Sequence, residues 1–377
     1  MSDPDNRNSF LSSLLTSLEE KSKVKKMPPS SLLSLSSNDY LGLSRHPGVI
    51  EASVKATQQF GTGATGSRYL SGNHPLNLKL ERTVSRFKSK GRGSGLVFSS
   101  GYHANLSVAS VFGSHAGAIY SDSENHASLI DGLRLLKRQV HVYPHGDWEW
   151  VKMHLQKTGA SHPMIVTESL FSMSGDFAPI PELYGIIRDK GGLLVIDDAH
   201  ATGTLGKNGR GALEYFSLDF DPDFMILTGT FSKALGSLGG FAILGEKSRT
   251  VLASLARPLV YTTALPPGIL AASCRSLEIL EDSSPLPGRL QALSRQWQEN
   301  LTGVSTPSPI VSLRGRLSTL RQESAKLAQF GLSLPVLHHP TVPEGEERLR
   351  LSVNLTWTPR VEEALRDTFS ERLGEFR

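Results

Sequence analysis

The residue with the most distinctive chemical surroundings in this sequence is Lys233, which stands among small and hydroxyl residues in segment 228–240. The apolar run 224–227 comes directly before this segment, so the segment begins where a buried strand would end. A lysine that captures a carbonyl group must be held near neutrality beside room for a flat ring, and small neighbours provide that room. Thr230, Ser232 and backbone N–H groups can hold a phosphate. Taken alone, the segment is equally consistent with a surface lysine in a glycine-rich loop.

A second candidate cluster, residues 197–203, ends the apolar run that begins at Leu193. Its Asp197 is a carboxylate at a strand end, which can keep a pyridine nitrogen protonated and make the ring an electron sink. His200 follows closely and can bond the phenolic oxygen of such a ring. Alone, the cluster is also consistent with an acidic turn that caps the next helix. The cluster indicates a site for a pyridine ring only if neighbouring strand ends carry other groups that can hold such a ring.

Three further strand ends carry such groups. His126 can stack on a planar cofactor, although a lone histidine is more often a loop or helix-cap residue. Ser100, Gly101 and Tyr102 end one strand and open a helix, whose N-terminal N–H groups suit a phosphate. Segment 167–173 ends another strand with a hydroxyl and a carboxylate in reach. Each cluster is unspecific alone, but together their order and spacing point to one chemistry.

The strands that would position these residues are short, nearly uninterrupted apolar runs separated by helical stretches. They are expected at 96–99, 118–121, 139–143, 164–168, 193–197, 224–227 and 241–244. This pattern predicts a mostly parallel sheet that is buried on both faces, and hence an α/β fold. Ligands bind such sheets beyond the C-terminal ends of the strands. We therefore expect the polar strand-end residues to form the site.

The pattern of expected strands and helices changes after the proline pair at 266–267. We predict an N-terminal segment at 1–45, a large domain at 46–268 and a smaller α+β domain at 269–377. In the first segment a short helix at 10–20 is expected to precede a flexible arm that ends at residue 30. The small domain is predicted to contain a break at 283–287, helices at 270–281, 289–301, 316–330 and 361–373, and strands at 310–313 and 349–353.

Composition excludes several classes of function. The chain has 377 residues, 38% hydrophobic and 20% charged content and a net charge of +4, as in ordinary globular proteins. It has no basic run interleaved with aromatics, so we expect no nucleic acid partner. Cys274 is the only cysteine, which excludes an intrachain disulfide and a cysteine-based zinc site. We find no membrane-spanning run or targeting signal and expect a cytoplasmic protein without a membrane partner.

The glycine-rich run 61–66 matches the G-x-G-x-x-G dinucleotide pattern. Residues 51–60 before it have a helical pattern, whereas the nucleotide motif must follow a strand. NAD binding, and with it an oxidoreductase, is therefore the least favoured alternative. The run through Gly72 is instead predicted to form a loop where backbone approaches a ligand or a partner subunit.

Taken in order, these segments resemble the α-oxoamine synthase family of pyridoxal 5'-phosphate (PLP) enzymes, which belongs to the fold-type-I superfamily. The similarity runs from about Leu35 to Leu351. It is carried by segments 37–43, 63–72, 101–102, 125–132, 167–176, 197–203, 230–236 and 340–351. The resemblance implies a mostly parallel seven-stranded sheet flanked by helices, a smaller C-terminal domain, PLP as cofactor, and a homodimer with its active site at the interface.

The resemblance also implies roles for single residues. Lys233 would form the Schiff base with the cofactor, Asp197 would pair with the pyridine nitrogen, and His200 would face the phenolic oxygen. His126 would stack on the ring, and Thr263 would reach the phosphate of the neighbouring subunit. The other residues expected around the cofactor are Ser100, Gly101, Tyr102, Ser172 and Thr230.

The implied reaction is a decarboxylating condensation. An amino acid, with L-alanine expected, would react with an acyl thioester such as pimeloyl-CoA to give an α-aminoketone, CoA and CO2. The alternatives are aldolase, lyase or aminotransferase chemistry with the same cofactor, and a non-catalytic subunit of a heterodimeric synthase. Retention of Lys233, Asp197, His200 and His126 speaks against the non-catalytic subunit.

The substrate residues are where the chain departs from the family pattern. Asn38 and His338 are the expected substrate contacts, and His338 stands where the family has an arginine that clamps the amino acid carboxylate. An imidazole cannot form the bidentate fork of a guanidinium and is only partly charged at neutral pH. We therefore predict a retuned amino acid pocket, in which Arg348 or Arg350 is a possible substitute.

Two further departures accompany His338. Ser169 stands where glycine is usual, and segment 354–357 replaces a stretch of small residues and histidine. The pair 338–339 is not predicted to bind a metal ion, because no further ligand cluster accompanies it.

Overall fold

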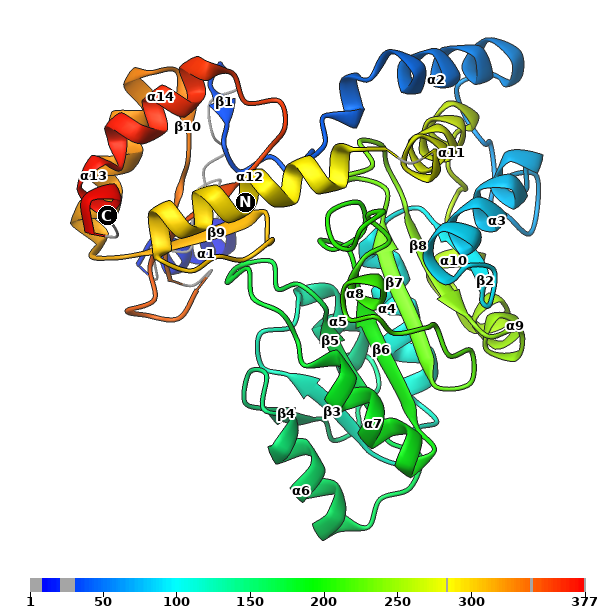
Figure 1. Cartoon of the computed structure of the whole chain (residues 1–377). Helices are drawn as coiled ribbons and strands as arrows, with labels where there is room; N and C mark the ends of the chain where they lie inside the picture. The colour runs from blue at the N-terminus through cyan, green and yellow to red at the C-terminus, as the bar shows by residue number, and fades with distance from the viewer. Residues whose placement is uncertain (1–8, 21–30, 283, 340–341, 376–377) are drawn as a thin grey trace, which may run out of the picture.

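The computed structural model describes residues 9–20, 31–282, 284–339 and 342–375. Its largest sheet has seven strands in the order β2-β8-β7-β6-β5-β3-β4 (Figure 1). Only β8 runs antiparallel to its neighbours, so the predicted mostly parallel sheet is confirmed. The strands are β2 (Ser94–Phe98), β3 (Ile119–Asp122), β4 (His141–Tyr143), β5 (Met164–Glu168), β6 (Leu193–Asp197), β7 (Met225–Thr230) and β8 (Gly240–Leu244).

Helices bury both faces of this sheet. On β6, Leu194 and Ile196 belong to one buried cluster and Val195 to another, because successive strand residues point to opposite faces. Residues of α4 (Gly101–Gly113), α5 (Ala127–Arg134), α9 (Glu246–Leu255) and α10 (Arg257–Val260) pack with Val195. The other cluster includes residues of α3 (Pro75–Ser89), α6 (Trp148–Thr158) and α7 (Ile180–Lys190). This double cover explains why the strands read as uninterrupted apolar runs.

The C-terminal part of the chain forms the predicted smaller domain (Figure 1). Its antiparallel sheet has the order β11-β12-β9. The strands are β9 (Ile310–Arg314), β11 (Val336–Leu337) and β12 (Arg348–Ser352), and the helices are α12 (Leu286–Thr302), α13 (Leu317–Gln329), α14 (Pro359–Thr368) and α15 (Ser370–Glu375). A buried aromatic contact between Trp297 and Trp357 ties α12 to the loop before α14.

The N-terminal segment after residue 30 runs against this small domain. Strand β1 (Leu33–Ser34) pairs in parallel with β10 (Leu332–Ser333). The N–H of Ser352 donates to the carbonyl of Leu35 at 2.8 Å, and that of Leu355 donates to the carbonyl of Tyr40 at 2.9 Å. These backbone bonds bring residues 35–40 alongside the end of β12.

Two predicted boundaries are corrected by the structure. The helix expected at 361–373 is two helices, because the backbone leaves the helical conformation at the buried Phe369. The break expected at 283–287 is shorter, since α12 already begins at Leu286 with proline in its first turn, where the missing N–H costs nothing. Helix α1 (Ser9–Glu20) matches its prediction, and the predicted arm at 21–30 lies outside the described residues.

The glycine-rich run follows α2 (Pro47–Phe60), as predicted, and not a strand. A Cβ atom on Gly72 would lie 2.1 Å from the carbonyl oxygen of Gly66, so the loop folds tightly on itself. Helix α11 (Pro267–Glu281) packs against α2 and α3. The predicted domain boundary at residue 268 falls in the first turn of this helix, and it stays a prediction. In the described part of the chain, every helix is too short or too polar to cross a membrane.

Candidate active site

The centre of the candidate site is the pair formed by Lys233, just after β7, and His200, just after β6. The Lys233 Nζ lies 2.7 Å from the His200 Nε2. Burial lowers the pKa of Lys233 to about 8, while the nearby carboxyl groups of Asp197 and Glu168 act in the opposite direction. Burial, together with the positive charges of Lys233 and Arg350, lowers the pKa of His200 well below its ordinary value. A neutral imidazole therefore faces an amine that is partly neutral near physiological pH.

A hydrogen-bonded chain continues from the other nitrogen of His200. The Tyr40 hydroxyl lies 2.8 Å from the His200 Nδ1 and 3.0 Å from the Asn38 Oδ1. The Arg350 Nη2 donates to this hydroxyl at 3.2 Å, and its Nη1 donates to Asn38 at 3.1 Å. The Arg350 Nε donates to the carbonyl of Ser172 at 2.7 Å. The structure thus brings together Lys233, His200 and the predicted contacts Asn38 and Ser172.

A second chain links Asp197 to His126. The Asn105 Nδ2, from α4, donates to the Asp197 Oδ2 at 2.6 Å and to the Ser128 Oγ at 2.9 Å. The Ser128 Oγ lies 2.7 Å from the Nδ1 of His126, which caps the start of α5. The N–H of Ala199 donates to the other Asp197 oxygen at 3.0 Å. The carboxylate is therefore fixed and buried, while the imidazole of His126 is exposed above the strand ends.

The start of α4 lies beside the end of β7. The Ser100 Oγ accepts the N–H of His103 at 3.1 Å and caps the helix. A Cβ atom on Gly101 would lie 3.1 Å from the Thr230 Cβ, so a side chain there would crowd the hydroxyl residue. The Thr230 Oγ1 lies 2.6 Å from the Ser232 Oγ. The first N–H groups of a helix have no intrahelical partner, so this corner can bind an anion.

Two residues that are predicted to contact the cofactor, Tyr102 and Thr263, lie outside the two hydrogen-bonded chains. Tyr102 is half-exposed, donates its hydroxyl hydrogen to Asp131 and turns its ring edge-on to His126 at 6.3 Å. Thr263 is exposed and pairs with Ser67 of the glycine-rich run. Within the described residues, no hydrogen bond joins Thr263 to the chain that contains Lys233.

The two arginines of β12 have different surroundings. Arg350 belongs to the chain that contains Lys233, whereas the Arg348 Nη2 is bound to the Glu346 carboxylate at 2.7 Å. His338, at the end of β11, is exposed, and its Nδ1 contacts the carbonyl of the next residue, His339, at 2.8 Å. A hollow of about 370 Å³ beside Arg348 is lined by His126, Ser172, Met173, Val342, Pro343 and Arg348, among others.

Ser169, where the sequence predicts a departure from the family pattern, is fixed by a hydrogen bond. Its hydroxyl donates to the Asp198 Oδ1 at 2.6 Å, while the Lys88 ammonium group binds the other oxygen of this buried carboxylate. Segment 354–357 is held at its start, where the Asn354 Nδ2 donates to the carbonyl of Asp39 at 2.7 Å. Both departures therefore brace the residues next to Asp197 and Tyr40.

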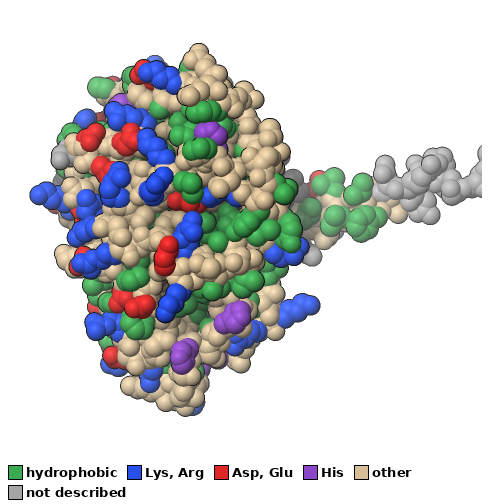
Figure 2. All heavy atoms as spheres, turned by 90° about the vertical axis from the view of Figure 1, so that its right-hand side faces the viewer, with side chains coloured by type: hydrophobic (Ala, Val, Ile, Leu, Met, Phe, Trp, Pro, Cys, Tyr) green, Lys and Arg blue, Asp and Glu red, His purple; other side chains and the backbone are tan. Residues whose placement is uncertain are grey.

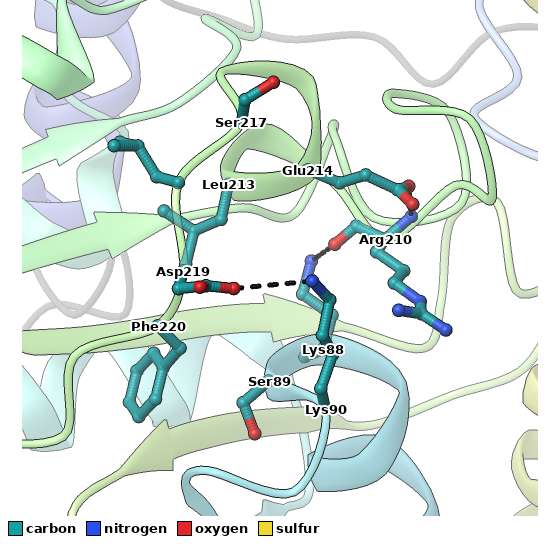
Figure 3. A pocket seen from close by; sticks show the side chains of 10 residues that line it. Lys88, Ser89, Lys90, Arg210, Leu213, Glu214, Ser217, Asp219 and Phe220 are labelled. Atoms are coloured by element: carbon teal, nitrogen blue, oxygen red, sulfur yellow. Dashed lines mark hydrogen bonds and ion pairs between the residues drawn. The ribbon is translucent and has the colours of Figure 1, made fainter.

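Lys88 also lines a second hollow of about 370 Å³, shown in Figure 3. Its ammonium group donates to the carbonyl of Arg210, and nearby Lys90 pairs with Asp219. The pair between Lys88 and Asp198 is almost fully buried, whereas the side chains of Lys90 and Asp219 are 61% and 51% exposed. None of the residues that line this hollow belongs to the two chains described above.

Sequence reasoning did not assign Tyr40, Asn105 and Ser128 to the site. Tyr40 lies within the segment 37–43 that was singled out, so a signal was present. Asn105 is a polar residue in the first turns of α4, and its burial at 3% exposure is accompanied by the bond to Asp197. In the described ranges, no group of three or more His, Cys, Asp or Glu is placed to hold a metal ion.

A half-buried lysine beyond the strand ends of a mostly parallel sheet, with a carboxylate and an imidazole beside it, defines the class of fold-type-I PLP-dependent transferases. Residues 30–366 match the family described as aminotransferase class I and II, and the chain belongs to this family. It is a PLP-dependent acyltransferase that joins an amino acid to an acyl-CoA.

Two curated relatives have the same product in their names. The chain is 39% identical over 332 residues to the putative 8-amino-7-oxononanoate synthase of Desulfovibrio desulfuricans, covering 87% of this chain and 86% of the relative. It is 39% identical over 326 residues to the 8-amino-7-oxononanoate synthase of Maricaulis maris, covering 86% of this chain and 82% of the relative.

Solved structures include two activities of this family. The serine palmitoyltransferase of Sphingomonas wittichii is 27% identical with a TM-score of 0.84, covering 100% of this chain and 99% of the other. A serine palmitoyltransferase of S. paucimobilis with bound PLP is 26% identical with a TM-score of 0.83, covering 99% and 100%. The 8-amino-7-oxononanoate synthase of Francisella tularensis is 28% identical with a TM-score of 0.75, covering 93% and 100%.

Proposed function

We propose that this enzyme condenses L-alanine with pimeloyl-CoA, releasing CoA and CO2 and forming 8-amino-7-oxononanoate. The observation that carries the proposal is the Lys233 amine, whose pKa is lowered to about 8 and which lies 2.7 Å from His200 beyond the strand ends. The product is the one in the names of the relatives at 39% identity. Seven carbons of pimeloyl and three of alanine, less the one in CO2, give its nine-carbon chain.

The residues of the site fit PLP. We assign the pyridine nitrogen to Asp197, whose two oxygens are each held by one N–H donor. We assign the phosphate to the N-terminal N–H groups of α4 at Gly101 and Tyr102, together with the hydroxyl of Thr230. We place Ser172 and His126 beside the ring. When bound, PLP supplies an electron sink for the negative charge that develops at the amino acid Cα.

Lys233 is the proposed base. Its Nζ removes the proton from the amino acid Cα and later returns a proton to the product. The lowered pKa leaves a useful fraction of the amine neutral near physiological pH. His200 accepts a hydrogen bond only while it is neutral, and its pKa is far too low for protonation at pH 7. Tyr40 fixes the orientation of that ring through the bond at 2.8 Å.

We assign recognition of the amino acid carboxylate to Arg350 and Asn38. Arg350 is the arginine of β12 that reaches the chain containing Lys233, whereas Arg348 is already paired with Glu346. A guanidinium has five N–H donors, and the structure commits four of those of Arg350, to the acceptors Asn38, Tyr40, Ser172 and Ser352. The remaining Nη2 donor supports one direct hydrogen bond, so the pocket binds the carboxylate differently from a free bidentate fork.

We further propose that a second copy of this chain covers the face shown in Figure 2, where hydrophobic side chains gather. The Tyr69 hydroxyl donates to the carbonyl of Ala253 at 2.6 Å, and the N–H of Ala264 donates to the carbonyl of Gly66 at 3.0 Å. Thr263 lies exposed in this region, as a contact to a neighbouring subunit requires. The exposed apolar residues here are Ile50, Val54, Phe60, Tyr69, Leu70, Val251, Leu255 and Tyr261.

A second candidate function is the same condensation with another amino acid and acyl thioester. It is favoured by the TM-scores of 0.83 and 0.84 to serine palmitoyltransferases, above the 0.75 to the Francisella synthase, and by the exposed His338. Both candidates require an acyl thioester. Aldolase, lyase or aminotransferase chemistry does not.

The test is thiol release by PLP-loaded enzyme with L-alanine and pimeloyl-CoA, beside panels of other amino acids and acyl-CoAs. Release with the alanine and pimeloyl pair, with 8-amino-7-oxononanoate identified by mass, is the expected result. Turnover with a different pair only, such as L-serine and palmitoyl-CoA, selects the second candidate. No release with any thioester, while amino acids still change the cofactor absorbance, contradicts both candidates. Light scattering of the same sample measures whether the chain is a dimer.

A further inference from the structure

A second buried carboxylate, Glu168, lies in the site beside Asp197. Glu168 ends β5 and Asp197 ends β6, and the two residues are opposite each other in a parallel strand pair. Residues in register on adjacent strands point to the same face of the sheet. Both are buried, with exposed fractions of 2% and 5%. The site therefore contains two neighbouring carboxyl groups at one edge of the sheet.

The two carboxyl groups are unequally supplied with hydrogen bonds. Asp197 accepts from the Asn105 side chain at 2.6 Å and from the N–H of Ala199 at 3.0 Å. The Glu168 Oε2 accepts the N–H of Ser172 at 3.2 Å, and the backbone of His126 also approaches this carboxyl group, but its buried Oε1 has no hydrogen-bond partner among the described residues. Donors stabilise the ionised form, and two adjacent buried carboxylates repel each other. The group with fewer donors is the one that keeps its proton.

We propose that Glu168 is a positioning residue, which stays protonated while Asp197 is ionised and thereby keeps the Lys233 amine closer to its neutral form. This inference deepens the proposed function, because its consequence is expressed through Lys233. The charged groups that face Glu168 are Asp197 from β6 and Lys233 from the loop after β7, and His126 approaches from the start of α5.

The charges around Glu168 support this assignment. Burial and the Asp197 charge raise the pKa of Glu168 to about 8, although the Lys233 charge opposes the shift. An ionised Glu168 would raise the pKa of Lys233, as Asp197 already does. A neutral Glu168 therefore leaves one carboxylate charge for the pyridine nitrogen and a larger neutral fraction of the Lys233 amine.

The test compares the wild-type chain with Glu168→Gln, which mimics the neutral carboxyl group. Thermal unfolding of both proteins is followed from about pH 5 to about pH 9, with and without PLP. A carboxyl group with a raised pKa in the folded state contributes stability that is present at low pH and is lost as pH rises. The wild-type midpoint should therefore fall relative to that of Glu168→Gln between about pH 5 and pH 8.

Glu363→Gln is the matched control, because Glu363 is exposed on α14. The thermal unfolding midpoint of Glu363→Gln should change with pH in the same way as that of the wild type. A difference between wild type and Glu168→Gln that does not change with pH would overturn the proposal, since Glu168 would then be ionised in the folded protein. This readout does not depend on the substrate, so it remains valid if the proposed condensation is wrong.

A second measurement addresses the case in which Glu168→Gln fails to fold. Carboxyl carbons of the wild-type chain, labelled at glutamate, are followed by NMR through the same pH range. One glutamate signal that titrates near pH 8 is expected, and its absence contradicts the proposal. Where the variant folds, its uptake of PLP by Lys233 should reach half-maximal rate at a lower pH than in the wild type. An unshifted midpoint would show that Glu168 does not act through Lys233.

Discussion

The hydrogen-bonded chains beyond the strand ends, which contain Lys233, His200 and Asp197, form what we call the strand-end network. This network and the segment around His338 differ in how firmly their polar groups are held. Lys233, His200 and Asp197 come from the large sheet, and each has a described partner or charge beside it. His338 is exposed, and the contact described for its ring is with the adjacent carbonyl. Cofactor chemistry needs a fixed geometry, which a buried network supplies. A segment outside that network can change without disturbing it, and this is where the sequence predicts a departure from the family pattern.

The largest effect is expected from removing the amine at the centre of the network. Lys233→Ala should lower the rate of thiol release by about 10³-fold, because it removes the proposed base. PLP should also be removed by gel filtration from the variant but not from the wild type. Lys247→Ala, on the exposed start of α9, is the control and should behave as the wild type. Retained turnover in Lys233→Ala would contradict the assigned base.

The next largest effect is expected at the buried ion pair between Lys88 and Asp198, next to Asp197. Lys88→Met leaves the Asp198 carboxylate buried without its cation and should lower the free energy of unfolding by about 3–5 kcal/mol. Lys90→Met breaks the exposed pair with Asp219 in the same hollow and should cost about 0–1 kcal/mol (Figure 3). Urea unfolding measures both. Equal losses would mean that burial does not distinguish the two pairs.

A pH dependence follows from the lowered pKa of Lys233, which is about 8. The amine reacts only when neutral, so its neutral fraction, and the rate at which cofactor-free protein captures PLP, should rise as pH increases through 8. Between pH 7 and pH 9 the expected increase is about tenfold. Absorbance of the captured cofactor gives the rate. A rate that keeps rising about tenfold per pH unit up to pH 10, without levelling off near pH 9, would indicate an amine with an ordinary pKa.

A smaller effect is expected at the link between the two domains. Tyr40→Phe removes the hydroxyl that orients His200, and it should reduce turnover about fivefold, or ~1 kcal/mol. Tyr184→Phe removes a comparable bond to Asp221, outside the site. The control should lose stability but keep its turnover. If the two variants have the same turnover, Tyr40 supports the fold and not the imidazole.

The smallest effect on rate, and the sharpest on specificity, is expected at His338. His338→Arg should change the ratio of turnover between L-alanine and other amino acids by a few-fold, because a guanidinium adds a fork for the carboxylate. His339→Arg tests whether a positive charge anywhere in this exposed segment has the same effect. An unchanged preference and apparent affinity in His338→Arg would refute the retuned pocket.

Much of the fold was predictable because burial leaves a strong pattern. The bounds of β5 and β6 coincide with the predicted 164–168 and 193–197, since these strands are covered on both faces and read as uninterrupted apolar runs. The division of the last helix into α14 and α15 was not predictable. It depends on where Phe369 packs in the core, and the helical pattern continues through it.

The sequence by itself determined the chemistry of the strand ends. Lys233, Asp197 and His200 each follow an apolar run within a short motif, and motifs of that kind are local. Only the tertiary structure decided their partners. Arg350 donates to Tyr40 across 310 positions of the chain, and Asn105 of α4 reaches Asp197 across 92 positions. Hydrogen bonds form between groups that folding brings within about 3 Å, and spacing along the chain does not encode that distance.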